Sequence, residues 1–133
     1  IADARGIKLQ FVLFQFGEFE LQGTLVGIHV SLESAHLSLE QGNQAARLTG
    51  ISMLSSLKAE IGDMNKVKRF IQVTGMVNAD PSFTQHSQVI NGFSDLMVEI
   101  FGEDGKHVRA AVGMSSLPFN MAVEIMAVVE VTD

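Results

Sequence analysis

An arginine and a glutamate near the C-terminal end of the chain are the residues whose types and spacing could do chemistry. Arg109 and Glu124 lie in two apolar segments that predict strands, on either side of Leu117. If the strands form a hairpin that turns about residues 116–117, the two side chains face each other with Cβ atoms ~5 Å apart. A guanidinium can hold a carboxylate by two parallel hydrogen bonds, and a glutamate can orient water or move a proton. A purely structural ion pair on the outer face of a sheet is the alternative.

The first third of the chain predicts strands. Residues 11–16 (FVLFQF) form a dense aromatic and β-branched run, and residues 25–32 (LVGIHVSL) form a second one. Gly17 and Gly23 lie between the two runs, and this pattern favours an antiparallel meander.

A long amphipathic helix should follow these strands. Ser38 and Gln41 have the S-x-x-Q spacing of a capping box, in which both side chains bind free backbone amides at a helix start. Apolar residues recur behind it at helical spacing, and Gly62 has the usual position of a glycine just beyond a helix end. Gly42 and Gly50 inside this helix each cost about 1 kcal/mol relative to alanine, so we expect close packing against a sheet there.

The remainder of the chain adds a strand, a second helix and two more strands. We expect these elements at Val67–Val77, Gln88–Phe101, His107–Met114 and Ala122–Val131. The apolar stripe of the second helix should consist of Val89, Phe93, Leu96, Met97 and Ile100. Residues 1–133 therefore predict a single α+β domain, in which a mixed β-sheet carries two helices on one face.

The composition narrows the classes of function. The 133 residues carry a formal net charge of −6, which argues against a nucleic-acid partner because such surfaces need clustered lysines and arginines. The small basic cluster of Lys66, Lys68 and Arg69 is expected to be the solvated start of a strand. Since 47% of the residues are hydrophobic, a domain of this size should bury part of its surface against another subunit.

The sequence does not predict a metal site, a reactive thiol or a membrane-spanning segment. The chain has no cysteine, which excludes disulfides and thiolate nucleophiles and suits the cytoplasm. His29, His36, His86 and His107 lack the spacing of metal ligands, and no glycine-rich phosphate loop is present. We therefore expect neither a metal nor a cofactor. The longest apolar stretch, residues 121–129, is too short to span a bilayer, so no membrane contact is expected.

Three stretches resemble one protein family. The segment HVRAAVGMSSLPFNMAVEIMAVVEV (107–131) is similar to the C-terminal signature of the Rid (YjgF, reactive intermediate deaminase) family: an arginine, small residues, Leu-Pro and a Val-Glu-Ile strand. Residues 40–83 resemble the first long helix and following strand of that family. The segment VINGFSDLMVEIFGEDGKH (89–107) resembles the second helix of a long-form branch, often labelled endoribonuclease L-PSP or chorismate mutase-like. The resemblance covers residues 38–131.

The resemblance implies both a fold and roles for individual residues. The fold would be that of Bacillus chorismate mutase-like proteins, assembled as a homotrimer with clefts between subunits. Arg109 matches the arginine that holds the substrate carboxylate, and Glu124 matches the acid that orients the attacking water. Ala111 stands where the family often has a cysteine whose backbone binds substrate. Either Asn91 or Ser94 would line the cleft.

Three functions remain open on this basis. The first is hydrolysis of reactive enamine or imine intermediates of amino-acid metabolism to keto acids and ammonia. The second is non-catalytic binding of small carboxylate metabolites on the same scaffold, and the third is RNA cleavage of the endoribonuclease L-PSP type. The chain departs from the family pattern near its start, where Phe16-Gly17 stands in place of Ser-Gly, and it contains no tyrosine.

Overall fold

The structure is a computed structural model that describes residues 8–14 and 37–132. It contains four strands and two long helices. The strands are β1 (Lys8–Phe14), β2 (Val67–Asn78), β3 (Val108–Met114) and β4 (Val123–Val131). The helices are α1 (Leu39–Ile61) and α2 (His86–Phe101). The expected strand at residues 25–32 lies outside the described residues, and the strand expected at 11–16 is observed at 8–14.

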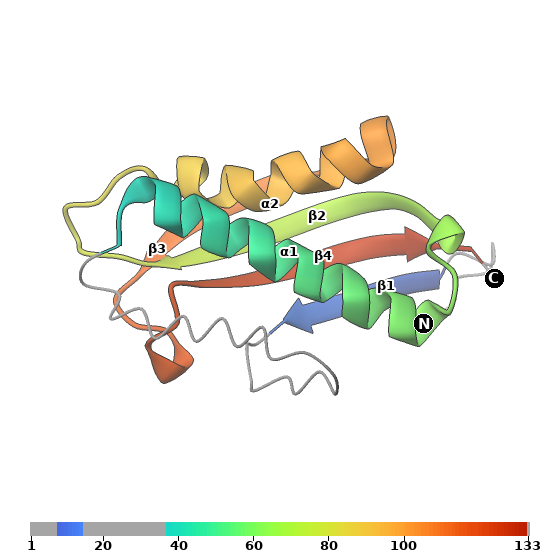
Figure 1. Cartoon of the computed structure of the whole chain (residues 1–133), viewed down its shortest axis with the longest axis horizontal. Helices are drawn as coiled ribbons and strands as arrows, with labels where there is room; N and C mark the ends of the chain where they lie inside the picture. The colour runs from blue at the N-terminus through green and yellow to red at the C-terminus, as the bar shows by residue number, and fades with distance from the viewer. Residues whose placement is uncertain (1–7, 15–36, 133) are drawn as a thin grey trace.

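The strands form one mixed sheet with the order β1-β4-β2-β3. Strand β4 pairs antiparallel with both β1 and β2, whereas β2 and β3 run parallel. Both helices cover the same face of the sheet, with α1 over β4 and β1 and α2 over β2 and β3 (Figure 1). The predicted α+β architecture, with two helices on one face of a mixed sheet, is therefore confirmed.

The expected hairpin between the last two strands is wrong. Strand β2 lies between β3 and β4, and it pairs with both of them. The reason is the crossover through α2, which returns the chain beside β2 in the parallel direction. The sequence VEIMAVVEV of β4 suits a strand with partners on both sides, whereas β3, with its alanines and glycine, suits an edge.

Local signals place α1 correctly. The Ser38 Oγ accepts a hydrogen bond from the Gln41 backbone N–H at 3.2 Å, and the Gln41 Oε1 accepts one from the Ser38 N–H at 2.9 Å. At the other end, Gly62 has a φ of 81° and donates its N–H to the Lys58 carbonyl oxygen at 2.8 Å. Glycine adopts this left-handed conformation without steric cost, so both predicted ends of the helix are confirmed.

The glycines inside α1 pack against α2, and not against the sheet as expected. A Cβ atom on Gly42 would lie 3.3 Å from Val89, and one on Gly50 would lie 2.9 Å from Leu96. The contact is closest at Gly92 of α2, where a Cβ atom would lie 2.0 Å from the backbone oxygen of Asn43. The two helix backbones approach each other so closely because small residues line both sides of the contact.

The apolar stripe of α2 is confirmed except at its end. Val89, Phe93, Leu96 and Met97 are buried, but Ile100 is 51% exposed because it follows the last buried turn of the helix. Ile90 is also fully buried and reaches the sheet at Gly75, where a Cβ atom would lie 2.6 Å from its side chain. Helix α2 therefore contacts α1 on one side and β2 on the other, and this fixes its position relative to β3.

Candidate functional site

Arg109 lies on the edge strand β3 and points toward α2. It is paired with Val73 of β2, whose side chain is buried beneath the helices, so Arg109 shares the helix-covered face of the sheet. Its Nη1 donates hydrogen bonds to the Asn91 Oδ1 at 2.9 Å and to the Ser94 Oγ at 3.0 Å. Asn91 and Ser94 are three residues apart on α2 and therefore share one side of the helix. The sequence left open which of them lines the cleft, and the structure brings both to Arg109.

A histidine extends this group of polar side chains. The Ser94 Oγ lies 2.9 Å from the His107 Nε2, and the His107 Nδ1 lies 2.7 Å from the carbonyl oxygen of Gly105. A carbonyl oxygen can only accept a hydrogen bond, so Nδ1 carries a proton. In the neutral ring Nε2 then accepts a hydrogen bond from the Ser94 hydroxyl. Burial lowers the pKa of His107, which favours this neutral form, and the nearby charge of Arg109 lowers it further.

Glu124 lies away from Arg109. It pairs with Met76 of β2, and its neighbours Val123 and Ile125 are buried on the helix-covered face. Because successive side chains in a strand point to opposite faces, Glu124 belongs to the opposite face, which neither α1 nor α2 covers and which is called here the helix-free face. Within one chain, the expected contact between Arg109 and Glu124 is therefore wrong: the two side chains lie on opposite faces of the sheet, with β2 between their strands.

Ala111 occupies the middle of β3, opposite Gly75 of β2, and its side chain packs against the core. Strand β3 is at the edge of the sheet formed by the described strands. An edge strand leaves alternate backbone groups without a strand partner. A backbone contact to a ligand beside Arg109 is therefore available to this strand, whatever the side chain at position 111.

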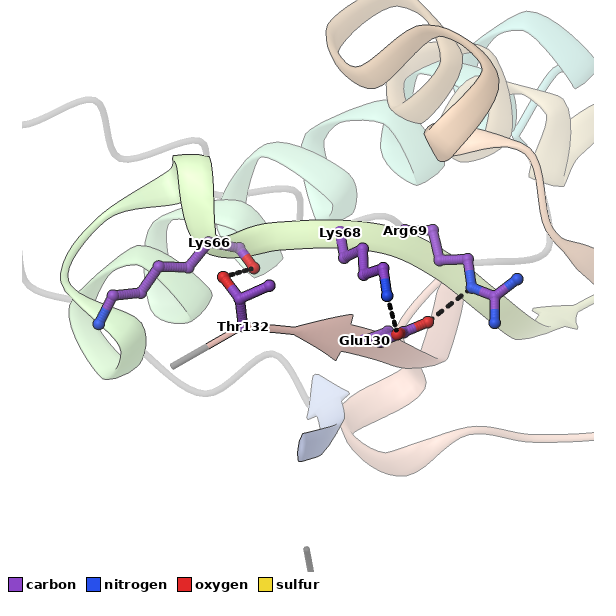
Figure 2. Close-up of polar contacts among 5 residues, drawn as sticks. All are labelled: Lys66, Lys68, Arg69, Glu130 and Thr132. Carbon is purple, nitrogen blue, oxygen red and sulfur yellow. Dashed lines mark hydrogen bonds and ion pairs between the residues drawn. The ribbon is translucent and has the colours of Figure 1, made fainter. Parts of the chain in front are cut away.

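A cluster of ion pairs around a buried carboxylate, which the sequence did not predict, lies at the other end of the sheet. The side chain of Glu130 on β4 accepts from the Lys68 Nζ at 2.9 Å and from the Arg69 Nε at 2.6 Å (Figure 2). The register shifts between Val67 and Arg69, and such a bulge lets two consecutive residues oppose one residue of the partner strand. Glu130 is only 3% exposed, and hydrogen bonds from Lys68 and then Arg69 lower its pKa.

The basic residues at the start of β2, which were expected to be merely solvated, therefore take part in specific contacts. The ammonium group of Lys66 points away from Glu130, and the Lys66 carbonyl oxygen accepts a hydrogen bond from the side-chain hydroxyl of Thr132 at 3.5 Å (Figure 2). The same oxygen also accepts the backbone N–H of Thr132 at 2.9 Å. Lys68 and Arg69 remain largely exposed while they bind the buried carboxylate. The sequence did not reveal these ion pairs, because it does not show that β2 pairs with β4. Only the register of that pairing brings Glu130 beside the basic residues.

A shallow hollow of about 510 Å³ lies beside the first residues of β3, and His107 is part of its lining, whereas Arg109 and Glu124 are not. Side chains of both charges line it, among them Arg69, Glu103, Asp104 and Lys106. Lys106 is itself paired with Glu103 at 2.6 Å. This mixed lining gives the hollow no net preference for an anion or a cation.

The described part of the chain contains no group of three or more histidine, aspartate or glutamate side chains placed to hold a metal ion. His86 lies against Gly113 of β3 and Phe83, and His107 binds Ser94, while His29 and His36 lie outside the described residues. Over the same described ranges, no helix combines the length and apolarity that crossing a bilayer requires.

Comparison with known sequences places this chain in a family. A family profile described as YjgF/chorismate mutase-like, putative endoribonuclease, matches residues 9–131. The curated protein TCP17 of Trypanosoma cruzi is 44% identical over 100 residues, which amount to 74% of this chain and 62% of that protein. The chain thus spans less than two thirds of the length of this relative.

Two solved structures have a fold similar to that of this chain. A crystal structure of an Agrobacterium tumefaciens protein of unknown function is 39% identical, has a TM-score of 0.75, and matches 92% of this chain and 77% of its own. The crystal structure of a putative endoribonuclease from Shewanella oneidensis is 27% identical, with a TM-score of 0.70 over 84% of this chain and 73% of its own. The chain therefore belongs to the YjgF/chorismate mutase-like family.

Proposed function

We propose that this protein hydrolyses small imines that carry a carboxylate, and that its active site is completed between the subunits of a homotrimer. The substrates are enamine or imine intermediates of amino-acid metabolism, and the products are keto acids and ammonia. Arg109 holds the carboxylate, Glu124 of a second subunit orients the water, and the backbone at Ala111 contributes to binding.

The uncompensated charge of Arg109 supports this proposal most directly. Arg47 pairs with Glu99 at 2.8 Å, and Arg69 pairs with Glu130 at 2.6 Å. Among the described residues, Arg109 instead binds only a neutral amide and a neutral hydroxyl, and it is exposed. A guanidinium that is held by neutral partners is available to an anion of complementary shape, and a planar carboxylate has that shape.

The reaction needs water and a proton carrier but no nucleophilic side chain. An enamine first takes a proton from solvent on carbon and becomes an iminium ion. Water then adds to the iminium carbon, the carboxylate of Glu124 accepts a proton from that water, and the same proton passes to the nitrogen of the resulting carbinolamine. The carbon–nitrogen bond breaks, ammonia leaves, and the carbinolamine hydroxyl releases its proton to solvent, so its oxygen, which came from the water, becomes the carbonyl oxygen of the keto acid.

The separation of Arg109 and Glu124 in one chain is the reason for a shared site. Glu124 is half-buried on the helix-free face, where Val112, Met114 and Met126 are exposed. Apolar surface of this kind favours association with a second copy. A trimer that buries this face would carry Glu124 of one subunit toward the edge strand of the next, where Arg109 lies.

The direct test follows the hydrolysis of freshly generated 2-aminoacrylate and of larger amino-acid imines. We expect wild-type protein to accelerate the reaction, and Arg109→Ala to abolish the acceleration. Arg47→Ala is the matched control, because it removes an exposed arginine that already pairs with Glu99, and it should retain full activity. No acceleration by folded, trimeric wild-type protein would exclude the deaminase function.

Carboxylate binding without turnover is the second candidate, and the distance between Arg109 and Glu124 within one chain favours it. In that case Arg109→Ala would abolish binding of a keto acid although no imine is hydrolysed. RNA cleavage, the activity ascribed to the similar Shewanella oneidensis protein, can be measured in the same preparations. Cleavage that requires Arg109 would replace both candidates.

A further inference from the structure

The guanidinium of Arg109 offers one particular edge to a ligand. It has five N–H donors, and Nη1 donates to both the Asn91 Oδ1 and the Ser94 Oγ. The remaining donors are on Nε and Nη2, and no described residue accepts from them. These two nitrogens lie along one side of the planar group, so they form a two-pronged donor that matches the two oxygens of a carboxylate.

The two residues that accept from Nη1 belong to a helix that is packed firmly in the core. Asn91 and Ser94 lie on α2, whose position is fixed where Ile90 packs onto Gly75 of the sheet and where Gly92 contacts α1. Helix α2 and β3 therefore cannot separate or slide without breaking core contacts. The carboxamide of Asn91 accepts with an oxygen that needs no particular proton position, whereas the Ser94 hydroxyl can rotate about its C–O bond.

His107 removes that rotational freedom. The His107 Nδ1–H donates to the Gly105 carbonyl oxygen, so the Nε2 presents a lone pair to Ser94. The Ser94 hydroxyl then donates to His107, and its own lone pairs are left for Arg109. The imidazole itself sits between the rings of Phe93 and Phe70, with centroid distances of 6.2 and 6.4 Å.

We propose that His107 is a positioning residue: it orients the Ser94 hydroxyl so that Asn91 and Ser94 engage Nη1 of Arg109 and turn the Nε–Nη2 edge toward a ligand carboxylate. Asn91 and Ser94 consequently act through Arg109 and not on the ligand. The inference rests on the carboxylate-binding role of Arg109 in the proposed function, and it specifies how the carboxylate is recognised. A ligand of the same shape with a neutral amide in place of the carboxylate should bind much more weakly.

The test measures binding, which does not depend on turnover. Titration calorimetry with 2-oxobutyrate as the probe, and with 2-oxobutyramide as its neutral counterpart, is applied to the full chain. We expect His107→Phe, which keeps a ring between Phe70 and Phe93 but removes both nitrogens, to weaken 2-oxobutyrate binding about tenfold. His107→Gln can place an amide oxygen near the position of Nε2, and it should retain most of the affinity.

Ser94→Ala provides a second, independent arm. If His107 acts through Ser94, Ser94→Ala should weaken binding as much as His107→Phe, and the double variant should be no weaker than either single variant. Where imine hydrolysis is measurable, the loss should raise KM and leave kcat unchanged. A ¹⁵N spectrum of His107 should in addition show the proton on Nδ1 in wild-type protein.

The outcomes separate this inference from the proposed function. If wild-type protein binds 2-oxobutyrate no better than the amide, the carboxylate role of Arg109 fails, and the inference fails with it. If wild-type protein prefers 2-oxobutyrate but His107→Phe and Ser94→Ala bind it equally well, only the positioning role is overturned. Should His107→Phe not fold, equal binding by Ser94→Ala and wild-type protein is sufficient to overturn it.

Discussion

At the scale of single residues, the neutral surroundings of Arg109 decide what it can bind. A charged acceptor at position 91 would change this, because an aspartate would pair with Nη1 at the present 2.9 Å and compensate the charge. We therefore expect Asn91→Asp to weaken binding of 2-oxobutyrate at least about fivefold, since the ligand must compete with an internal carboxylate. Asn65→Asp adds the same charge at an exposed site away from Arg109 and is the control. Equal losses in both variants would mean that only net charge matters.

The sequence identified Arg109 and its two companions but not the histidine. The resemblance to the family named Arg109, and it offered Asn91 and Ser94 as alternatives for a polar residue that lines the cleft. His107 carries no motif of its own. Its role depends on a hydroxyl thirteen positions earlier and on a backbone carbonyl two positions earlier, and only the folded chain brings these three groups together.

At the scale of elements, the close contact between α1 and α2 should be sensitive to single methyl groups. A Cβ atom at Gly92 would lie 2.0 Å from a backbone oxygen, which cannot move without shifting α1. We expect Gly92→Ala to lower the free energy of unfolding by roughly 1–3 kcal/mol or more. Gly42→Ala meets only a side chain at 3.3 Å, and the helix propensity of alanine returns about 1 kcal/mol, so its stability should be nearly unchanged. Urea unfolding measures both, and similar values for the two variants would contradict the tight contact.

The pairing of β2 with β4 should make stability depend on pH through Glu130. Its pKa is lowered in the folded protein, first by the hydrogen bond from Lys68 and then by that from Arg69. Its ionised form is thus favoured by folding, and this contribution is present above the ordinary value of 4.5 and is lost as the pH falls through the lower folded pKa. Urea unfolding of wild-type protein and Glu130→Gln should therefore differ most at neutral pH and converge in acid. The pKa of Asp80 is also lowered, but wild-type protein and Glu130→Gln both contain Asp80, so its contribution cancels in the comparison. A difference that stays constant with pH would contradict this role.

Helices were easier to predict from the sequence than strand partners. The start and end of α1 depend on side chains within four residues of each other, and both were confirmed. The hairpin of the last two strands failed because strand order depends on contacts between distant segments, here the insertion of β2 between β3 and β4. The pairing of β2 with β4 was not predicted, and for this reason the cluster around Glu130 was missed as well. For the same reason Glu124 was expected beside Arg109, whereas the two side chains lie on opposite faces of the sheet.

At the scale of the whole molecule, the apolar composition and the exposed apolar side chains on the helix-free face favour an assembly. Val108 on the edge strand is 68% exposed, and Val112, Met114 and Met126 are exposed on the same face. The two groups with proposed chemical roles are divided between the two faces of one sheet. An active site in which both contact the same substrate therefore needs a second copy of the chain.

The most direct measurement of this shared site mixes two inactive variants. Arg109→Ala and Glu124→Gln are unfolded together, refolded as hybrids, and assayed for hydrolysis of 2-aminoacrylate, with each variant refolded alone as the control. If Arg109 and Glu124 act from different subunits, random assortment restores intact sites at about a quarter of the wild-type number, and activity returns to that level. If hybrids of confirmed composition are as inactive as the separate variants, the two residues do not form a site between subunits, and the central claim is wrong.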